Sequence, residues 1–393
     1  MASKPIGPPF VPPFVPPFVL RDVAPADLDD LQETAIHLDS VNLPNDRTAL
    51  ARIIERSVQS FTGELPKADR CFVFVVRDEV EGRVVGTSMI FAQHGSRRAP
   101  HVYFDVIEEE RYSETLDRHF SHRLLRIGYN YKGLTEIGGL VLRPEYRGHA
   151  QQLGRLLACV RFLYMGLHRE LFCDEVVSEL LPPLEPDGTS LLWESLGRRF
   201  TGLTYQEADA LSRQNKEFIR ALFPQDPLYA TLLPGDVQKL IGEVGPETKG
   251  VERMLREIGF AYAHRIDPFD GGPHFHARTD AISLVRDVRR ARVAVAPTRG
   301  LGRPQALLVA REGAAAPFFL AARVEAPLPA ALPGPRVSSV TAPSRSRGAE
   351  GAIGATLSLP AEVASALRLA PGDEAAVLPL PERSAPLPER SAP

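Results

Sequence analysis

The segment from Ile137 to Leu157 combines residue types and spacing that suit the binding of an anionic group. A strand-like run containing two adjacent glycines ends at Arg143-Pro144, and residues 147–152 (RGHAQQ) then open an amphipathic helix. Backbone N–H groups at a helix N-terminus, together with the helix dipole, attract phosphate groups. A small residue such as Gly148 lets the backbone approach a ligand closely. We therefore predict a pyrophosphate-binding turn; a strand, turn and helix without a ligand is the alternative.

Three histidines flank a tight turn further along the chain. His264, His274 and His276 lie on either side of residues 269–273 (FDGGP), and imidazole is a common metal ligand. No carboxylate or cysteine joins them at the spacing of a zinc site, and the three cysteines are far apart with no CxxC pair. We therefore predict no bound metal, and the cysteine usage suits a reducing cytoplasm.

Apolar periodicity predicts a mixed α/β sheet that positions these residues. The expected strands are residues 18–22, 71–76, 82–91, 137–142, 175–180 and 199–203, and the expected helices are residues 28–35, 50–61, 153–163 and 190–196. Residues 206–290 have a more helical pattern, clearest at 218–222 and 251–258. Short strands at 292–295 and 306–309, a polar linker at 343–351 and a strand–helix–strand pattern at 357–377 predict a small β-rich region.

Both ends of the chain are rich in proline. Residues 8–19 repeat PPFV three times, which favours an extended polyproline II arm, and residues 379–393 repeat PLPERSAP. We predict disordered tails at residues 1–18 and 381–393. Either tail could dock into an aromatic groove, and a solvated tail without a partner is the alternative.

The composition excludes several classes of protein. Hydrophobic residues make up 44% and charged residues 24%, as in ordinary globular proteins. The 46 Lys and Arg residues against 49 Asp and Glu residues leave no basic excess for a nucleic-acid partner. The longest apolar run, Leu156–Leu167, is interrupted by Arg161 and is too short to span a membrane, and the Pro-Pro pairs near the N-terminus break any signal peptide. We expect a cytoplasmic protein with no membrane or nucleic-acid partner.

The turn at 147–152 resembles the R/Q-x-x-G-x-G/A loop with which GCN5-related N-acyltransferases hold the pyrophosphate of coenzyme A, although Ala150 and Gln152 depart from it. Further segments, in order and spacing, resemble arginine N-succinyltransferases. They are residues 63–67 (GELPK), 72–78 (FVFVVRD), 140–147 (LVLRPEYR), 193–200 (WESLGRRF), 218–229 (FIRALFPQDPLY), 241–244 (IGEV) and 269–273 (FDGGP). The resemblance runs from about residue 19 to 290.

This resemblance implies an α/β fold with a GNAT-like acyl-CoA N-acyltransferase domain. We place that domain, a mixed sheet with helices, at residues 19–205. An α+β extension follows at 206–290, and a small β-rich C-terminal domain follows at 291–380.

The implied reaction is the transfer of succinyl from succinyl-CoA to the α-amino group of L-arginine. The amine attacks the thioester carbonyl, which a backbone N–H near Leu140 polarises. The residues implied to contact succinyl-CoA are Leu140, Leu142, Arg147, Gly148, His149, Ala150 and Gln152. Glu179 and Asp270 are candidates to pair with the substrate guanidinium, and a solvated or structurally paired carboxylate is the alternative for each.

Two departures from the family bear on catalysis. The family's presumed proton-donor histidine, in a Val-His-Pro step, corresponds to Gly245, and the arginine that follows the retained Glu179 corresponds to Leu181. General acid–base help is worth roughly 10²–10⁴-fold in rate, so we expect Gly245→His to raise turnover. Tyr229 is a candidate proton donor to the leaving thiolate, with packing as its alternative role.

Three hypotheses on function remain open from the sequence. The chain is an arginine N-succinyltransferase, an acyltransferase for another amine such as ornithine, or a catalytically impaired homologue that binds acyl-CoA as the partner of a paralogous subunit. A homo-oligomer or a hetero-oligomer is compatible with each. No permanently bound cofactor is expected, because succinyl-CoA is a co-substrate.

Overall fold

The computed structural model describes residues 16–36, 43–96, 99–212, 215–296, 303–328 and 355–381. The first fifteen residues of the proline-rich arm, the predicted linker at 343–351 and the tail from residue 382 lie outside them. The chain forms two compact units. The larger contains residues 22–75 and 84–287, and the smaller contains the chain up to Arg21, Val76–Arg83 and the chain from Val288 onward. The domain boundaries predicted at 205 and 290 stay predictions, because contacts alone do not show which part folds by itself.

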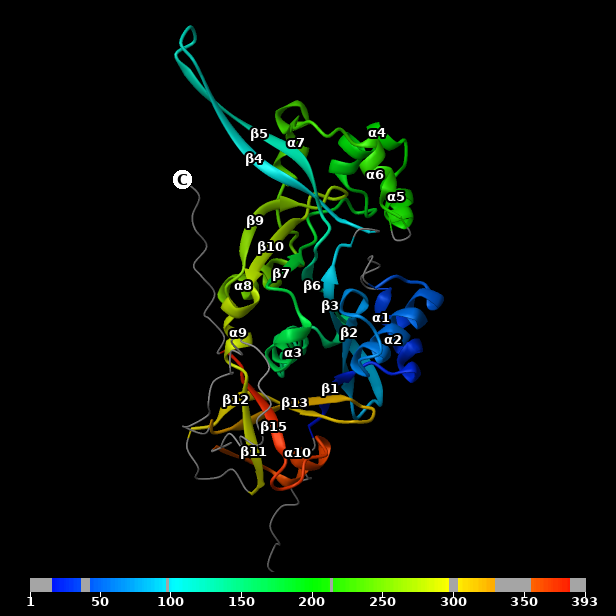
Figure 1. Cartoon of the computed structure of the whole chain (residues 1–393), viewed down its shortest axis with the longest axis vertical. Coiled ribbons are helices and arrows are strands. Elements are labelled where there is room, and N and C mark those ends of the chain that lie inside the picture. The colour runs from blue at the N-terminus through cyan, green and yellow to red at the C-terminus, as the bar shows by residue number, and fades with distance from the viewer. Residues whose placement is uncertain are drawn as a thin grey trace, which may run out of the picture. The chain divides into compact units, whose positions relative to one another are not determined.

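The larger unit is a mixed α/β structure (Figure 1). Its strands are β2 (Cys71–Asp78), β3 (Arg83–His94), β4 (His101–Ser113), β5 (Arg118–Asn130), β6 (Leu134–Leu142), β7 (Glu175–Glu179), β8 (Leu228–Tyr229), β9 (Ala261–Ile266) and β10 (Pro273–Arg278). Its helices are α1 (Leu28–Ala35), α2 (Arg47–Phe61), α3 (Leu153–Leu167), α4 (Arg198–Thr201), α5 (Tyr205–Ser212), α6 (Glu217–Leu222), α7 (Gly235–Leu240), α8 (Lys249–Glu257) and α9 (Ser283–Arg286).

These strands form one sheet in the order β2-β3-β6-β7-β10-β9-β4-β5-β8. The pair β6 and β7 is parallel, whereas β3 pairs with β6 and β10 pairs with β7 in antiparallel fashion. Strand β2 shows how alternation fixes the layers. Val73 and Val75 join a core cluster with residues of α1 and α2, while Phe72 and Phe74 contact the Tyr164 ring of α3. Helices therefore cover both faces of this part of the sheet.

Strands β4 and β5 form a long hairpin that the sequence analysis missed. They pair from His101 with Asn130 to Ser113 with Arg118, and Figure 1 shows the hairpin (cyan) projecting from the rest of its unit. The distal residues 108–113 (EEERYS) and 118–123 (RHFSHR) are polar and mostly exposed, so they lack the apolar alternation that signals a strand.

Two other predictions need correction. The strand expected at 199–203 is instead helical, because the helix predicted at 190–196 continues through a π-helical turn, Trp193–Gly197, into α4 and ends at Gly202 with φ +73°. The region 206–290, predicted to be more helical, also contains the strands β9 and β10, which the turn at 269–273 joins. The other strands and helices expected from the sequence are present, with α2 beginning at Arg47 rather than at residue 50.

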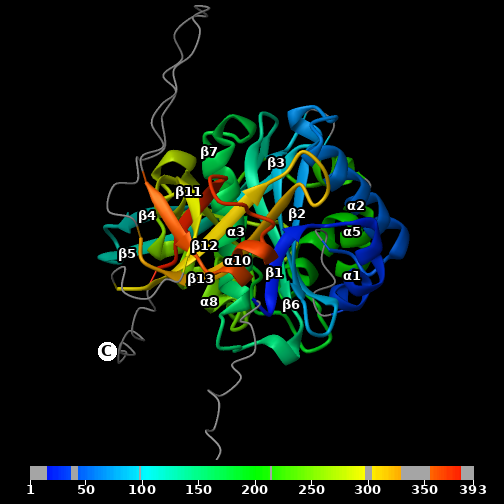
Figure 2. The same ribbon diagram turned by 90° about the horizontal axis from the view of Figure 1, so that it is seen from below.

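The smaller unit is β-rich. It contains β1 (Phe18–Asp22), β11 (Arg289–Val295), β12 (Gln305–Glu312), β13 (Phe319–Ala326), β14 (Thr356–Leu359), β15 (Glu374–Pro379) and α10 (Ala361–Ala366). The strand order is β14-β11-β15-β12-β13-β1, so the first strand of the chain pairs with β13. Helix α10 packs Val363 and Leu367 into a core shared with these strands, and it lies beside them in Figure 2.

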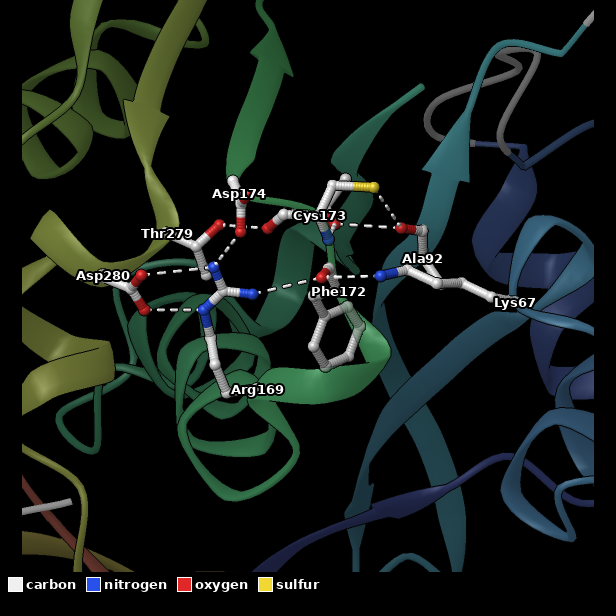
Figure 3. Close-up of polar contacts among 9 residues, drawn as sticks. Lys67, Ala92, Arg169, Phe172, Cys173, Asp174, Thr279 and Asp280 are labelled. Atoms are coloured by element: carbon white, nitrogen blue, oxygen red, sulfur yellow. Dashed lines mark hydrogen bonds and ion pairs between the residues drawn. The ribbon is translucent and has the colours of Figure 1, made fainter. Parts of the chain in front are cut away.

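The connection from α3 to β7 is fixed by polar contacts (Figure 3). Arg169 pairs with Asp174 at 2.7 Å and with Asp280 at 2.6 Å, and the carbonyl oxygen of Phe172 accepts from Lys67 Nζ at 2.8 Å. The Thr279 hydroxyl donates to the Cys173 carbonyl at 2.6 Å. These bonds tie the segment before β7 to Lys67 and to the residues that follow β10. Among the described residues, no helix combines the length and apolar character needed to cross a bilayer.

Candidate active site

A cavity opens where β6 and β7 diverge. The two strands pair only at Thr135 with Val176 and at Glu136 with Val177. Beyond these pairs, residues 138–140 of β6 and residues 178–181, at the end of β7 and just after it, both line a cavity of about 810 Å³. The lining residues are Asn45, His94, Glu136, Ile137, Gly138, Gly139, Leu140, Arg161, Ser178, Glu179, Leu180, Leu181, Leu184, Asp187, Gly188, Tyr205, Gln206, Asp209, Ala210, Ser212, Lys216, Thr248, Val251, Asp267, Phe269 and Asp270.

Strand β6 has a β-bulge where it borders this cavity. The register with β3 shifts between Thr87 and Met89, so that Gly139 and Leu140 together oppose the single residue Ser88. Gly139 has φ +55°, and a Cβ atom there would lie 2.8 Å from the Met89 side chain, so the position requires glycine. A bulge interrupts the regular ladder and re-aims backbone groups. The bulge therefore leaves backbone groups at the cavity wall that are outside the regular hydrogen-bond ladder.

The turn at 147–152 leads into α3. Gly148 has φ +74°, and Gln152, the N-cap residue of α3, has φ +57°. The Gln152 side chain does not cap the helix, so the first-turn N–H groups can serve a ligand. Arg147, Gly148 and Ala150 are exposed, and His149 Nδ1 accepts from the Gln151 N–H at 3.2 Å. The turn has the geometry of an anion site open to solvent.

Three carboxylates lie at one end of the cavity. Asp267 Oδ1 accepts from the Phe269 N–H at 2.7 Å, and Asp270 Oδ1 accepts from the Gly272 N–H at 2.7 Å. Burial, with the charge of Glu179, raises the pKa of Asp267 to about 7, and burial, with the charge of Asp267, raises the pKa of Asp270 well above its usual range. The two carboxyl groups are therefore partly protonated at neutral pH unless a cation lies beside them.

Glu179 is bound by histidines. His101 Nε2 donates to Glu179 Oε1 at 2.8 Å, and His274 Nε2 lies 3.6 Å from the same oxygen. Burial lowers the pKa of His101 and lowers that of His274 to about 3, so both rings are neutral. Burial opposes ionisation of Glu179, but the positive charge that His274 carries when protonated and the hydrogen bond from His101 outweigh it, so the pKa of Glu179 lies well below the usual range. Glu179 is thus an ionised carboxylate in the cavity wall.

His94 forms a second histidine–carboxylate pair. Its Nδ1 lies 2.7 Å from Glu136 Oε2, and both residues line the cavity with Leu140. Burial disfavours the charged ring, but the charge of Glu136 and the hydrogen bond to it outweigh burial and raise the pKa of His94. When the ring is neutral and Nδ1 donates to Glu136, Nε2 has the free lone pair of a base.

The histidines have more carboxylate neighbours than the sequence spacing indicated. The sets His94, His101, Glu179 and His274, Glu179, Asp267 each place one potential ligand atom per residue within 4.8 Å of one another. The pairing of β10 with β7 brings His274 opposite Glu179, which are far apart in sequence. His264 lies apart at φ +53°, its ring against Tyr262.

Comparison with known proteins identifies the family. A model described as arginine N-succinyltransferase beta subunit matches residues 18–284. The arginine N-succinyltransferases of Salmonella typhimurium and Salmonella newport are each 34% identical over 279 residues, 70% of this chain and 80% of theirs. The chain belongs to the arginine N-succinyltransferase family.

A solved structure supports the fold of this family member. Subunit AI of the arginine/ornithine succinyltransferase from Pseudomonas aeruginosa aligns with a TM-score of 0.73 and 25% identity, covering 93% of this chain and 99% of that chain. The predicted fold class, a mixed α/β acyltransferase sheet with helices, is confirmed.

The structure brings some predicted site residues of the succinyltransferase together and separates others. Leu140, Glu179 and Asp270 line one cavity. Leu142 lies at the end of β6, close to the start of α3, because a Cβ at Gly154 would lie 4.0 Å from its side chain. Tyr229 does not line this cavity; its hydroxyl donates to Glu109 at 2.9 Å.

Gly245 has no room for a side chain. Its N–H donates to the Leu181 carbonyl at 2.9 Å, and a Cβ atom would lie 2.7 Å from the Pro182 carbonyl oxygen. The expectation that Gly245→His raises turnover is therefore corrected, because the backbone of residues 181–182 leaves no room for the side chain. A group elsewhere must handle the proton.

The cavity residues that sequence reasoning missed include four charged or titratable ones used below, His94, Arg161, Lys216 and Asp267. Arg161 had a signal, since it is the one charged residue in the apolar run Leu156–Leu167. His94 lies just beyond the predicted end of its strand at residue 91, and no motif marks it. Only the folded sheet brings these four residues to one cavity.

Proposed function

We propose that this protein transfers the succinyl group of succinyl-CoA to the α-amino group of L-arginine. The observation that carries the proposal is the cavity between β6 and β7, with a bulge at Leu140 on its wall and a turn at 147–152, which leads into α3, beyond the end of the same strand. A thioester whose pyrophosphate lies at the turn would enter this cavity with its carbonyl near Leu140, and the bulged backbone would polarise the carbonyl.

The carboxylates of the cavity suit the guanidinium of the acceptor. Glu179 is ionised, and Asp267 and Asp270 are half-buried carboxyl groups with raised pKa values. A planar guanidinium can bind such oxygens in bidentate fashion. We assign Glu179 and Asp270 to substrate binding, with Asp267 as a third member of the group.

His94 is our candidate for the base. The α-ammonium group must lose a proton before its nitrogen can attack, and His94 Nε2 is the free nitrogen of a ring whose Nδ1 is held by Glu136. The new C–N bond then forms as the C–S bond breaks. His94 takes the first ammonium proton and passes it to solvent, so that the neutral amine can attack. The second proton leaves the nitrogen after the C–N bond has formed, passes to His94, and then goes to the departing coenzyme A thiolate.

Assembly and location complete the proposal. Succinyl-CoA acts as a co-substrate, and the chain needs no resident cofactor. We propose a cytoplasmic enzyme that assembles with itself or with a paralogous subunit; the Pseudomonas aeruginosa relative is described as a subunit.

Coenzyme A affinity should depend on the turn before α3. Gly148→Pro forces φ to about −65° where the turn needs +74°, and Arg147→Ala removes the exposed cation nearest the helix N-terminus. We expect Gly148→Pro to weaken binding at least tenfold and Arg147→Ala to weaken it severalfold, as measured by calorimetry. Arg278→Ala, at the exposed end of β10, is the control. Unchanged affinity in both turn variants would remove this assignment.

Arginine binding should release protons at pH 7. A bound guanidinium lowers the raised pKa values of Asp267 and Asp270, so protons shared by the pair leave as the ligand enters. Calorimetry with saturating coenzyme A, in two buffers of different ionisation enthalpy, should show this release, and affinity should fall as the pH drops from 7 to 5. Asp270→Asn keeps the bond to Gly272 and should reduce the release. Tight binding with no proton exchange would contradict the assignment.

Without ligand, the folding stability of the protein should change with pH in the direction opposite to arginine affinity. Because the folded-state pKa of Asp267, about 7, lies above its unfolded value, its contribution to stability is complete at low pH and is lost as the pH rises towards 7. Urea unfolding of the free protein at several pH values measures this, with arginine expected to offset the loss.

A further inference from the structure

Arg161 is a buried cation without a carboxylate partner. It lies on α3, is 2% exposed and lines the cavity between β6 and β7. Its Nε donates to the Ala158 carbonyl at 3.3 Å, and its guanidinium carbon lies 5.8 Å from the centre of the Phe162 ring. Within the described part of the chain, no carboxylate forms an ion pair with it. Burial lowers its pKa to about 10, so it remains charged at neutral pH.

Another buried arginine shows what a structural partner set looks like. Arg143 is 4% exposed, and its guanidinium bonds to Glu33 Oε2 at 2.8 Å and to the Asp30 carbonyl at 3.1 Å. A buried charge with no such partner is costly to the fold. A charged Arg161 without a carboxylate partner therefore lowers the stability of the fold rather than raising it. Its place in the cavity wall points to a bound anion.

We propose that Arg161 binds the free carboxylate of the transferred acyl group and so selects dicarboxylic acyl-CoA substrates. This proposal rests on the proposed function. The planar guanidinium of Arg161 can bind a carboxylate in bidentate geometry. Arg161 lines the same cavity as the Leu140 bulge, where the thioester carbonyl would lie.

The charges of the cavity then match the charges of both substrates. Glu179, Asp267 and Asp270 are available to the cationic acceptor, and Arg161 is available to the anionic donor. Lys216 is the other lysine or arginine side chain lining the cavity. Its charge acts on Asp267, so we assign it to the carboxylate group of the cavity and not to the acyl donor.

The specificity test compares succinyl-CoA with butyryl-CoA, which has the same number of acyl carbons but ends in a methyl group. The wild-type protein should favour succinyl-CoA in kcat/KM by about 10²-fold or more, because a buried charge left unpaired is costly. Arg161→Met should reduce the ratio to about one or below while keeping activity on butyryl-CoA. Arg161→Lys keeps the charge but loses the fork, so it should be intermediate. Arg155→Met, half-buried on the same helix, should keep the wild-type ratio.

A second readout needs no activity. Arg161→Met should leave the melting temperature of the free protein unchanged or higher, whereas Arg143→Met should lower it. If Arg161→Met unfolds or melts as early as Arg143→Met, Arg161 is structural and the proposal is overturned. The proposal is also overturned if the substrate ratio survives in Arg161→Met, or if Lys216→Met abolishes it instead. If the wild-type protein releases thiol from no acyl-CoA, the proposed function fails, while the melting comparison still tests Arg161.

Discussion

His94→Asn is expected to lower kcat by about 10²–10⁴-fold with little change in the KM for succinyl-CoA. Asparagine can keep the bond to Glu136 through its amide nitrogen, but it offers no basic nitrogen in place of Nε2. The substitution therefore removes the proposed proton acceptor and leaves the cavity wall in place.

The pH dependence of kcat gives a second reading of the same residue. A base works in its neutral form, so the wild-type rate should rise with pH through the raised pKa of His94. Glu136→Gln removes the charge that raises this pKa, and the step should move to lower pH. His264→Asn is the control, because His264 is exposed and has a positive φ that asparagine tolerates. Full activity in His94→Asn, or a step that stays in place in Glu136→Gln, would exclude this base.

Gly245→Ala is expected to lower the free energy of unfolding by about 1–3 kcal/mol, and Gly245→His by more. The added Cβ atom would lie 2.7 Å from the Pro182 carbonyl oxygen and 2.9 Å from its carbon, so the backbone of residues 181–182 must move. That backbone borders the cavity through Leu181, so turnover should fall as well.

Gly250→Ala provides the matched control. Gly250 is an exposed residue of α8 with nothing within 4 Å of an added Cβ atom, so alanine should raise stability by up to about 1 kcal/mol. Urea unfolding of the two alanine variants measures the difference. A Gly245→Ala protein as stable as the wild type, or a faster Gly245→His enzyme, would show that the loop accommodates side chains and that the missing histidine limits the rate.

The sequence alone predicted the parts of the fold that carry local signals. Cys71–Val76 is a run of buried β-formers, and the turn at 147–152 leads into a helix with an unbroken apolar face, so both were recognised. The β4–β5 hairpin was missed because its distal half is polar and exposed. Residues 199–203 were assigned wrongly because aromatic and β-branched residues suggested a strand, whereas the preceding helix continues as far as Gly202.

The candidate site was harder to predict because most of it is assembled by strand pairing. His274 meets Glu179 through the β7–β10 ladder, and no sequence spacing records that register. The effect of Gly245→His was misjudged for a similar reason, because the atoms that block a side chain come from residues 181–182, which are far from Gly245 in sequence. Arg161 was visible as a charge in an apolar run, and only the fold shows that it is buried in the cavity wall without a carboxylate partner among the described residues.

The central claim is most directly tested by incubating the purified full-length protein with succinyl-CoA and L-arginine and following thiol release together with the mass of the arginine product. We predict thiol release that requires arginine and yields N-succinylarginine. Ornithine and other amines are tested in parallel in place of arginine. Release that is independent of any amine, or the absence of release with every acceptor, would contradict the proposed succinyl transfer.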